Sequence, residues 1–308
     1  MSIEMRAVLC NALKERMAKD KRIIVIDADL AKANGTHSLR KDFPDRALDV
    51  GIQEANMQSI AAGLSTYGFI PFTTTFAPFA TRRALDQIML SCAYAKQNVR
   101  IIGSDPGISA ELNGGTHMGN EDVAALRAIP DICIFEPVDA IQFEKAFDQI
   151  VEYKGVMYIR MFRKAIDDVF DENYKFDLFK ADTLKEGKDI SIFASGIMVQ
   201  ESIKALELLK EKGIDAELIN IHTIKPIDKE AVLKSAKKTG HVLVCENHNV
   251  IGGLGSAVAE ILSENYPVKM ARIGVQDKFG EVGKLPYLKE VYKMRDVDIV
   301  EKAIELLK

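Results

Sequence analysis

A glutamate, Glu54, stands where a polar segment gives way to an apolar helical pattern. It follows residues 49–53 and precedes small residues that allow close packing, among them Ala55, Ala61 and Ala62. A carboxyl group drawn away from water favours its protonated form, so it can donate a hydrogen bond or relay a proton. The alternative is a surface carboxylate that matches the positive end of a helix dipole. The local pattern alone leaves both open.

Two aromatic side chains, Phe76 and Phe79, lie three positions apart ahead of another helical pattern. Rings at this spacing can form a wall against which a flat heteroaromatic ring stacks. Packing in a hydrophobic core is the alternative. This pair therefore indicates a cofactor pocket only in combination with other motifs.

A histidine, His117, ends the glycine-rich run Asn113-Gly114-Gly115-Thr116-His117, shortly after Ile108. A glycine-rich loop would leave such a ring exposed and mobile, where it can meet a substrate and exchange protons. Chance is the alternative for a single histidine. The loop setting makes His117 a candidate catalytic residue.

These residues fall in the first of two regions in which short β-branched runs alternate with helical periods. Such alternation is typical of a mostly parallel sheet covered by helices. The expected strands are residues 23–27, 99–103, 132–135, 157–161, 190–194, 216–221, 241–245 and 268–273. The expected helices are residues 1–20, 54–67, 84–96, 122–128, 140–153, 199–212, 229–239 and 255–265.

A change of composition separates the two regions, because residues 165–188 are rich in Asp, Lys and Glu and show no clear period. We therefore expect a first domain at residues 1–165, a linker at 166–188 and a smaller domain at 189–308. The predicted fold class is α/β, with two doubly wound, mostly parallel-sheet domains.

Composition excludes several classes of protein. The net charge is −4 and basic residues are scattered, so nothing indicates binding to nucleic acid. No apolar stretch reaches the length of a membrane span, and residues 1–20 are charged throughout, unlike a signal peptide. The four cysteines form no CxxC pair, so we do not expect a disulfide framework or a zinc site. We expect a cytoplasmic location instead.

Together, and in this order, the three motifs resemble the pyrimidine-binding domain of the transketolase family. The resemblance continues through residues 156–163, and residues 246–248, 252–257 and 273–283 resemble the family's C-terminal domain. It covers essentially the whole chain. It implies the C-terminal subunit of a split transketolase, in which thiamine diphosphate serves the transfer of a two-carbon ketol unit between a ketose and an aldose.

The resemblance also implies roles for individual residues. Glu54 matches the glutamate that hydrogen-bonds the aminopyrimidine ring of thiamine diphosphate and favours the tautomer that activates the cofactor. Phe76, Phe79 and Ile108 match the pyrimidine pocket. His117 matches the histidine that contacts the substrate's oxygen atoms and moves protons.

The substrate side departs from the family pattern. Asn113 replaces an aspartate that binds a substrate hydroxyl in the family. Asp105 replaces a histidine, and Ala33 replaces a serine that contacts phosphate. Either Arg160 or Arg163 matches an arginine that binds the substrate's phosphate, and the sequence does not decide between them. We count all five as substrate-binding positions and expect an atypical ketose or ketose derivative.

The chain lacks the Gly-Asp-Gly segment that, with a downstream Asn, holds Mg²⁺ and the diphosphate in this family. We therefore expect no metal ligand here. The resemblance implies an N-terminal partner subunit that supplies the Mg²⁺ ligands, a 2+2 heterotetramer as the simplest symmetric assembly, and an isolated chain that is inactive.

Two other functions stay open. A β-subunit of a 2-oxo-acid dehydrogenase or related decarboxylating enzyme shares both domains and the glutamate, although His117 favours the transketolase. A non-catalytic regulatory subunit would explain Asn113, Asp105 and Ala33, but not the retained Glu54. The loop at residues 252–257 also has two interpretations. It could be a dinucleotide-binding turn, but its pattern favours a tight turn at a subunit contact.

Overall fold

The computed structural model describes residues 3–308 and divides into two compact units. The first unit contains the chain up to Pro106 together with Ala125–Phe176. The second contains Gly107–Ala124 together with Asp177–Lys308. By their contacts, residues 107–124 thus belong with the second unit, although chain order places them in the first expected domain.

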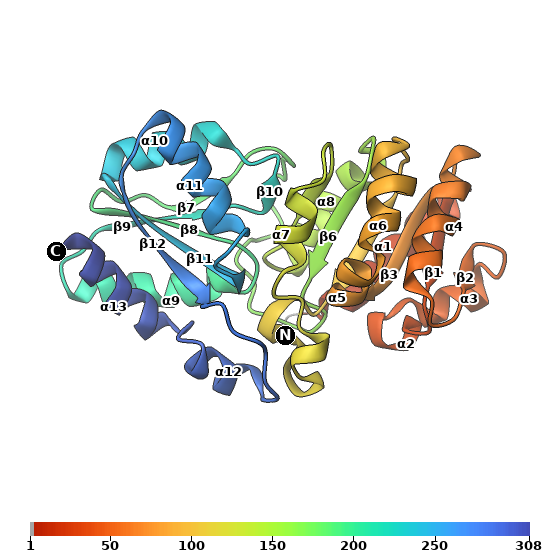
Figure 1. The fold of residues 1–308 in the computed structure, drawn as a ribbon, viewed down its shortest axis with the longest axis horizontal. Helices are drawn as coiled ribbons and strands as arrows, with labels where there is room; N and C mark the ends of the chain where they lie inside the picture. The colour runs from red at the N-terminus through yellow and green to blue at the C-terminus, as the bar shows by residue number, and fades with distance from the viewer. Residues whose placement is uncertain (1–2) are drawn as a thin grey trace. The chain divides into compact units, whose positions relative to one another are not determined.

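The first unit is built on a parallel sheet with the strand order β5-β6-β4-β3-β1-β2. Figure 1 labels β6, β3, β1 and β2 of this sheet. The strands are short and almost entirely buried, as expected for runs rich in Ile, Val and Phe between helices. Their bounds are β1 (Ile23–Asp27), β2 (Ala47–Asp49), β3 (Ile70–Phe76), β4 (Arg100–Ser104), β5 (Cys133–Phe135) and β6 (Met157–Met161).

Helices flank this sheet, with α4 packed on β3 and α1 packed on α8. Their bounds are α1 (Met5–Lys19), α2 (Ala31–Asn34), α3 (Leu39–Asp42), α4 (Glu54–Thr66), α5 (Ala77–Ala80), α6 (Leu85–Gln87) and α8 (Ala140–Glu152). The single helix expected at residues 84–96 is wrong in detail. A 3₁₀ turn (Arg82–Ala84) precedes α6, and a π-helical segment (Ile88–Tyr94) follows it and packs its buried Ile88 and Cys92 near α4.

The second unit has a five-stranded sheet of order β12-β11-β8-β9-β7, parallel except for β7. The strands are β7 (Asp182–Lys185), β8 (Ile190–Ala194), β9 (Ala216–Asn220), β11 (His241–Asn249) and β12 (Lys269–Val275), with a short β10 at Thr223–Lys225. The helices are α9 (Met198–Glu211), α10 (Lys229–Thr239), α11 (Leu254–Asn265), α12 (Leu285–Val291) and α13 (Asp296–Leu307), and α7 (Asp122–Arg127) carries residues of both units.

The predicted α/β class with two mostly parallel sheets is confirmed. Two details of the second unit differ from expectation. The end of the expected linker is a strand, because β7 pairs antiparallel with β9. Strand β11 extends beyond Cys245 to Asn249, so residues 246–248 lie on a strand.

Among residues 3–308, no helix is both long enough and apolar enough to span a membrane. The four cysteines are unpaired thiols. Burial raises the pKa of Cys92, Cys133 and Cys245 to about 12, so these three are unreactive core side chains.

Candidate active site

Glu54 is the first residue of α4, and its side chain is only 2% exposed. Its carboxylate accepts a hydrogen bond from Nη1 of Arg83 at 2.7 Å. A buried carboxylate needs such a partner, because an unpaired charge away from water is costly. The structure therefore presents Glu54 as a buried carboxyl group held in place by an arginine that sequence reasoning did not single out.

Phe76 and Phe79 lie beside this ion pair. Phe76 ends β3 and Phe79 lies on α5, with ring centroids 6.2 Å apart and planes inclined by 54°. The guanidinium carbon of Arg83 lies 3.8 Å from the Phe79 centroid, a cation–π contact. Arg83 thus joins the acidic residue and the aromatic pair into one cluster.

Asp105 and Arg163 continue the cluster at the carboxyl ends of β4 and β6. Arg163 Nε lies 2.5 Å from Asp105 Oδ2, and the Arg163 backbone N–H donates to Asp105 Oδ1 at 3.2 Å. The Arg163 guanidinium carbon also lies 5.2 Å from the Phe76 ring centroid. Two positions that the sequence assigns to the substrate are therefore ion-paired with each other, next to the aromatic wall.

Ala33 meets two arginines through its backbone carbonyl. Nη1 of Arg163 and Nη1 of Arg6 each lie 3.4 Å from Ala33 O. Arg6, in the first turn of α1, is also paired with Glu4 at 2.8 Å. Sequence reasoning missed Arg6, because nothing in the sequence near residue 6 points to a segment 27 positions away.

The segment that carries Ala33 is anchored by buried polar side chains. Thr36 and Thr74 donate hydrogen bonds to the carboxylate of Asp27, at the end of β1. Asn34 contacts Thr74 and accepts a 2.7 Å hydrogen bond from Ser104. Burial raises the pKa of Asp27 to about 6 in spite of the threonine donors. These contacts fix the Ala33 carbonyl between the arginines.

Arg160 occupies a different environment from Arg163. It lies within β6, is 1% exposed, and pairs with the buried Glu136 at 2.5 Å. Arg163 lies beyond the strand end and keeps 18% of its side chain exposed. A ligand at the surface of this unit can reach Arg163, whereas Arg160 is committed to the core.

Ile108, Asn113 and His117 lie in the second unit. Ile108 is fully buried, Asn113 is exposed, and His117 ends a 3₁₀ turn, Gly115–His117. The His117 ring is partly exposed, and its Nδ1 lies 3.0 Å from Thr116 Oγ1. The turn forms because His117 N–H bonds to Gly114 O at 3.0 Å.

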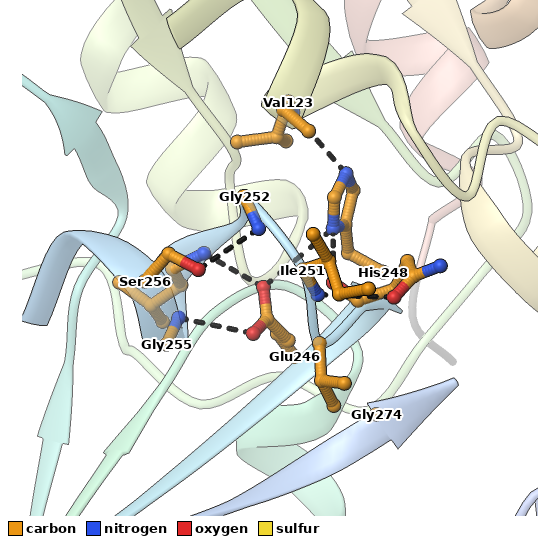
Figure 2. Close-up of polar contacts among 12 residues, drawn as sticks. Val123, Glu246, His248, Ile251, Gly252, Gly255, Ser256 and Gly274 are labelled. Carbon is orange, nitrogen blue, oxygen red and sulfur yellow. Dashed lines mark hydrogen bonds and ion pairs between the residues drawn. The ribbon is translucent and has the colours of Figure 1, made fainter. Parts of the chain in front are cut away.

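The glycine loop before α11 holds a carboxylate of the chain itself. Glu246 accepts hydrogen bonds from the backbone N–H groups of Leu254 and Gly255 at 2.7 and 3.0 Å (Figure 2). A Cβ on Gly253 would collide with this carboxylate. In a dinucleotide-binding turn these amides face the ligand's phosphate. Since Glu246 fills that place with negative charge, the dinucleotide alternative is excluded.

Replacing Glu246 with glutamine is expected to lower the free energy of unfolding by about 1–3 kcal/mol, because one buried backbone N–H loses a charged acceptor. The measurement is urea unfolding followed by circular dichroism. Glu264→Gln, on the exposed end of the same helix, is the matched control and is expected to stay within about 0.5 kcal/mol of the parent. Equal effects for the two variants would contradict this role of Glu246.

Among the residues that the structure describes, no three His, Cys, Asp or Glu side chains gather as metal ligands. The first unit thus offers an ion-paired acid, two rings and a pair of arginines. Such a set can hold a flat ring and an anionic group.

Comparisons with known proteins agree with these features. Residues 1–167 match the transketolase pyrimidine binding domain and residues 179–299 the transketolase C-terminal domain. The chain is 51% identical to the 6-deoxy-6-sulfo-D-fructose transketolase subunit SqwH of Clostridium sp. (strain MSTE9), over 98% of this chain and 94% of that protein. It is 34% identical to an apulose-4-phosphate transketolase subunit of Phocaeicola vulgatus, over 99% and 98% of the two chains.

The fold is similar to a solved structure described as a split gene transketolase, an inactive beta4 tetramer. The two share 40% sequence identity and a TM-score of 0.91, over 100% of this chain and 99% of that one.

Proposed function

This chain belongs to the transketolase family, and from that premise we propose that it serves a transketolase whose donor is a sulfonated ketose. It is a subunit of a thiamine-diphosphate-dependent transferase that moves a two-carbon ketol unit from a ketose to an aldose, together with an N-terminal partner subunit. Removing two carbons from a six-carbon, 6-sulfonated ketose leaves a four-carbon aldose that keeps the sulfonate. The acceptor aldose becomes a ketose longer by two carbons.

The cluster around Glu54 fits the aminopyrimidine end of the cofactor. When bound, thiamine diphosphate supplies the nucleophilic carbon that takes up the ketol unit. Glu54 is buried, as a partner for a ring nitrogen must be, and Arg83 keeps its carboxylate oriented. Phe76 and Phe79 supply aromatic faces beside it, and Ile108 is assigned to the pyrimidine pocket by the family resemblance alone. These residues bind and orient the ring, and Glu54 holds or releases the proton there.

His117 is assigned to the substrate's oxygen atoms, where an imidazole can donate and accept protons near neutral pH. Asn113, exposed on the same loop, is assigned to a substrate hydroxyl. An amide can both donate and accept a hydrogen bond, so it suits a hydroxyl group of either orientation.

The charges around Ala33 carry the proposal for a sulfonate. Arg6 and Arg163 both point to the Ala33 carbonyl, yet each already has an acidic partner, Glu4 and Asp105. A sulfonate carries one negative charge, whereas a phosphate monoester carries about 1.5 to 2 at neutral pH. Because the positive charge of this site is already partly neutralised by Glu4 and Asp105, the site favours the singly charged sulfonate over the more highly charged phosphate. The name of the SqwH relative supports the same choice.

The metal and the diphosphate are assigned to the partner subunit, since this chain has no Gly-Asp-Gly segment. We expect the two subunits to form a 2+2 heterotetramer. The cytoplasmic location expected from four unpaired cysteines stays a prediction.

The test mixes the purified chain with the partner subunit, thiamine diphosphate and Mg²⁺. Ketol transfer is expected only in the mixture, and 6-deoxy-6-sulfofructose is expected to exceed fructose 6-phosphate in kcat/KM by about tenfold, the effect of about 1.4 kcal/mol. The measurement is the aldose released from each donor, by mass spectrometry. Equal or greater use of the phosphate would refute the sulfonate proposal. Release of CO₂ from a 2-oxo acid without an acceptor would instead favour a decarboxylating enzyme.

A further inference from the structure

The loop that carries His117 is held by residues of the second unit, far away in sequence. We infer that Asn247 is a positioning residue for transketolase catalysis, which acts through this loop. The inference rests on the proposed substrate role of His117. It also assigns to the second unit a task in the reaction, the placement of a substrate-handling side chain.

The first end of the loop is fixed by Asn247, on strand β11. Its Oδ1 accepts a hydrogen bond from the Ile108 N–H at 3.0 Å. Gly107 has a φ of +57°, and a Cβ there would collide with both the carbonyl and the side chain of Asn247. Gly107 N–H also bonds to Gly119 O at 3.2 Å, which closes the loop on itself. The loop therefore begins at a place defined by one asparagine.

The second end of the loop is fixed by the next two residues of the same strand. Asn249 N–H donates to Asn120 O at 2.8 Å. His248 Nε2 accepts the Ala124 N–H at 3.3 Å, while Nδ1 lies 2.5 Å from Asn249 O. An Nε2 that accepts the Ala124 N–H leaves Nδ1 to donate to the Asn249 carbonyl, so both ring nitrogens are engaged. Three consecutive residues of β11 thus hold both ends.

The middle of the loop rests on residues 280–285, the segment that ends at the first residue of α12. Glu111 Oε1 accepts the Leu285 N–H at 3.1 Å. A Cβ on Gly115 would collide with the Gly280 carbonyl, and one on Gly114 would lie 2.9 Å from Val282. The turn that ends in His117 therefore packs closely against the backbone of Gly280, in a part of the second unit distant in sequence. Its position depends on these contacts.

Position matters because a displacement of about 1 Å in a reacting arrangement can cost about 100-fold in rate. Asn247 is 1% exposed, and the bond that fixes the loop runs from its side chain to a backbone amide. Asn247 can therefore affect catalysis by setting the position of the loop that carries His117. This distinguishes it from Glu246, whose side chain supports the start of α11.

The experiment uses the full chain assembled with its partner subunit and measures kcat/KM with 6-deoxy-6-sulfofructose in a double-mutant cycle. The variants are Asn247→Ala, His117→Ala and both together. Asn247→Ala is expected to lower kcat/KM about 10- to 100-fold, and to have little further effect once His117 is alanine. Asn247→Asp keeps the Oδ1 acceptor and is expected to recover most of the activity. Hydrogen exchange of residues 107–119 is expected to accelerate in Asn247→Ala.

Additive losses in the cycle, or full activity of Asn247→Ala, would overturn the inference. Where Asn247→Ala fails to fold, as judged from its thermal midpoint, Glu111→Ala replaces it in the same cycle with Glu111→Gln as its conservative match. Glu111→Ala removes the acceptor of Leu285 N–H from the loop side, and its cycle decides in the same way. An inactive parent complex, or a His117→Ala variant with full activity, would instead refute the proposed function.

Discussion

Replacing Glu54 with glutamine is expected to lower the ketol-transfer rate of the assembled enzyme by about 10²- to 10⁴-fold. Glutamine keeps the size of the side chain but cannot take up or release a proton, and it loses the ion pair with Arg83. The measurement is kcat with saturating thiamine diphosphate, so that weaker cofactor binding does not dominate. A loss of this size places Glu54 at the cofactor.

The matched control is Glu15→Gln, an exposed glutamate on α1 that also pairs with a cation, Lys19. It is expected to leave kcat within about twofold, as surface substitutions usually do. If Glu54→Gln retained parental activity in the complex, Glu54 would not be catalytic, and the regulatory-subunit alternative would return.

Replacing Arg163 with methionine is expected to lower kcat/KM for 6-deoxy-6-sulfofructose by about 10- to 100-fold, the effect of losing one charged hydrogen bond of about 1.5–3 kcal/mol. Most of the loss is expected in KM, because the sulfonate is far from the carbon that reacts. With xylulose, a ketose without a charged end, kcat/KM is expected to change little. The measurement is initial rates with both donors.

Arg22→Met is the control for Arg163, since Arg22 forms an exposed ion pair with Asp20 at 2.7 Å and contacts none of the proposed site residues. It is expected to leave both donors unaffected. An equal loss with the sulfonated and the uncharged donor would show that Arg163 supports the fold of the site and does not read the anion.

Local patterns were enough to predict most of the fold. The runs at residues 23–27 and 157–161 coincide with β1 and β6, and Glu54 begins α4 as the helical period indicates. Tertiary contacts decided the rest. Strand β7 has a polar, half-exposed sequence, and it is a strand because it pairs with β9. The length of β11 follows from its pairing with β12, which a five-residue apolar run does not reveal.

The site shows the same division. Position in the sequence motif does not distinguish Arg160 from Arg163 as the anion-binding arginine. However, a charged side chain inside a buried strand needs a partner there, and Arg160 pairs with Glu136. That signal was present in the sequence. Arg6 and Arg83 could not be assigned in this way, because they meet Ala33 and Glu54 at separations of 27 and 29 residues. Such contacts are visible only in three dimensions.

The assignment of residues 107–124 to the second unit has a consequence for engineering and for the evolution of this chain. A chimera that exchanges only residues 177–308 with another transketolase would place a native loop on foreign supports at Asn247 and at the segment before Leu285. Residues 107–124 and the residues that hold them therefore have to be exchanged as one set. A crossover chosen from chain order alone separates them, so recombination between relatives at such a point is expected to displace the loop.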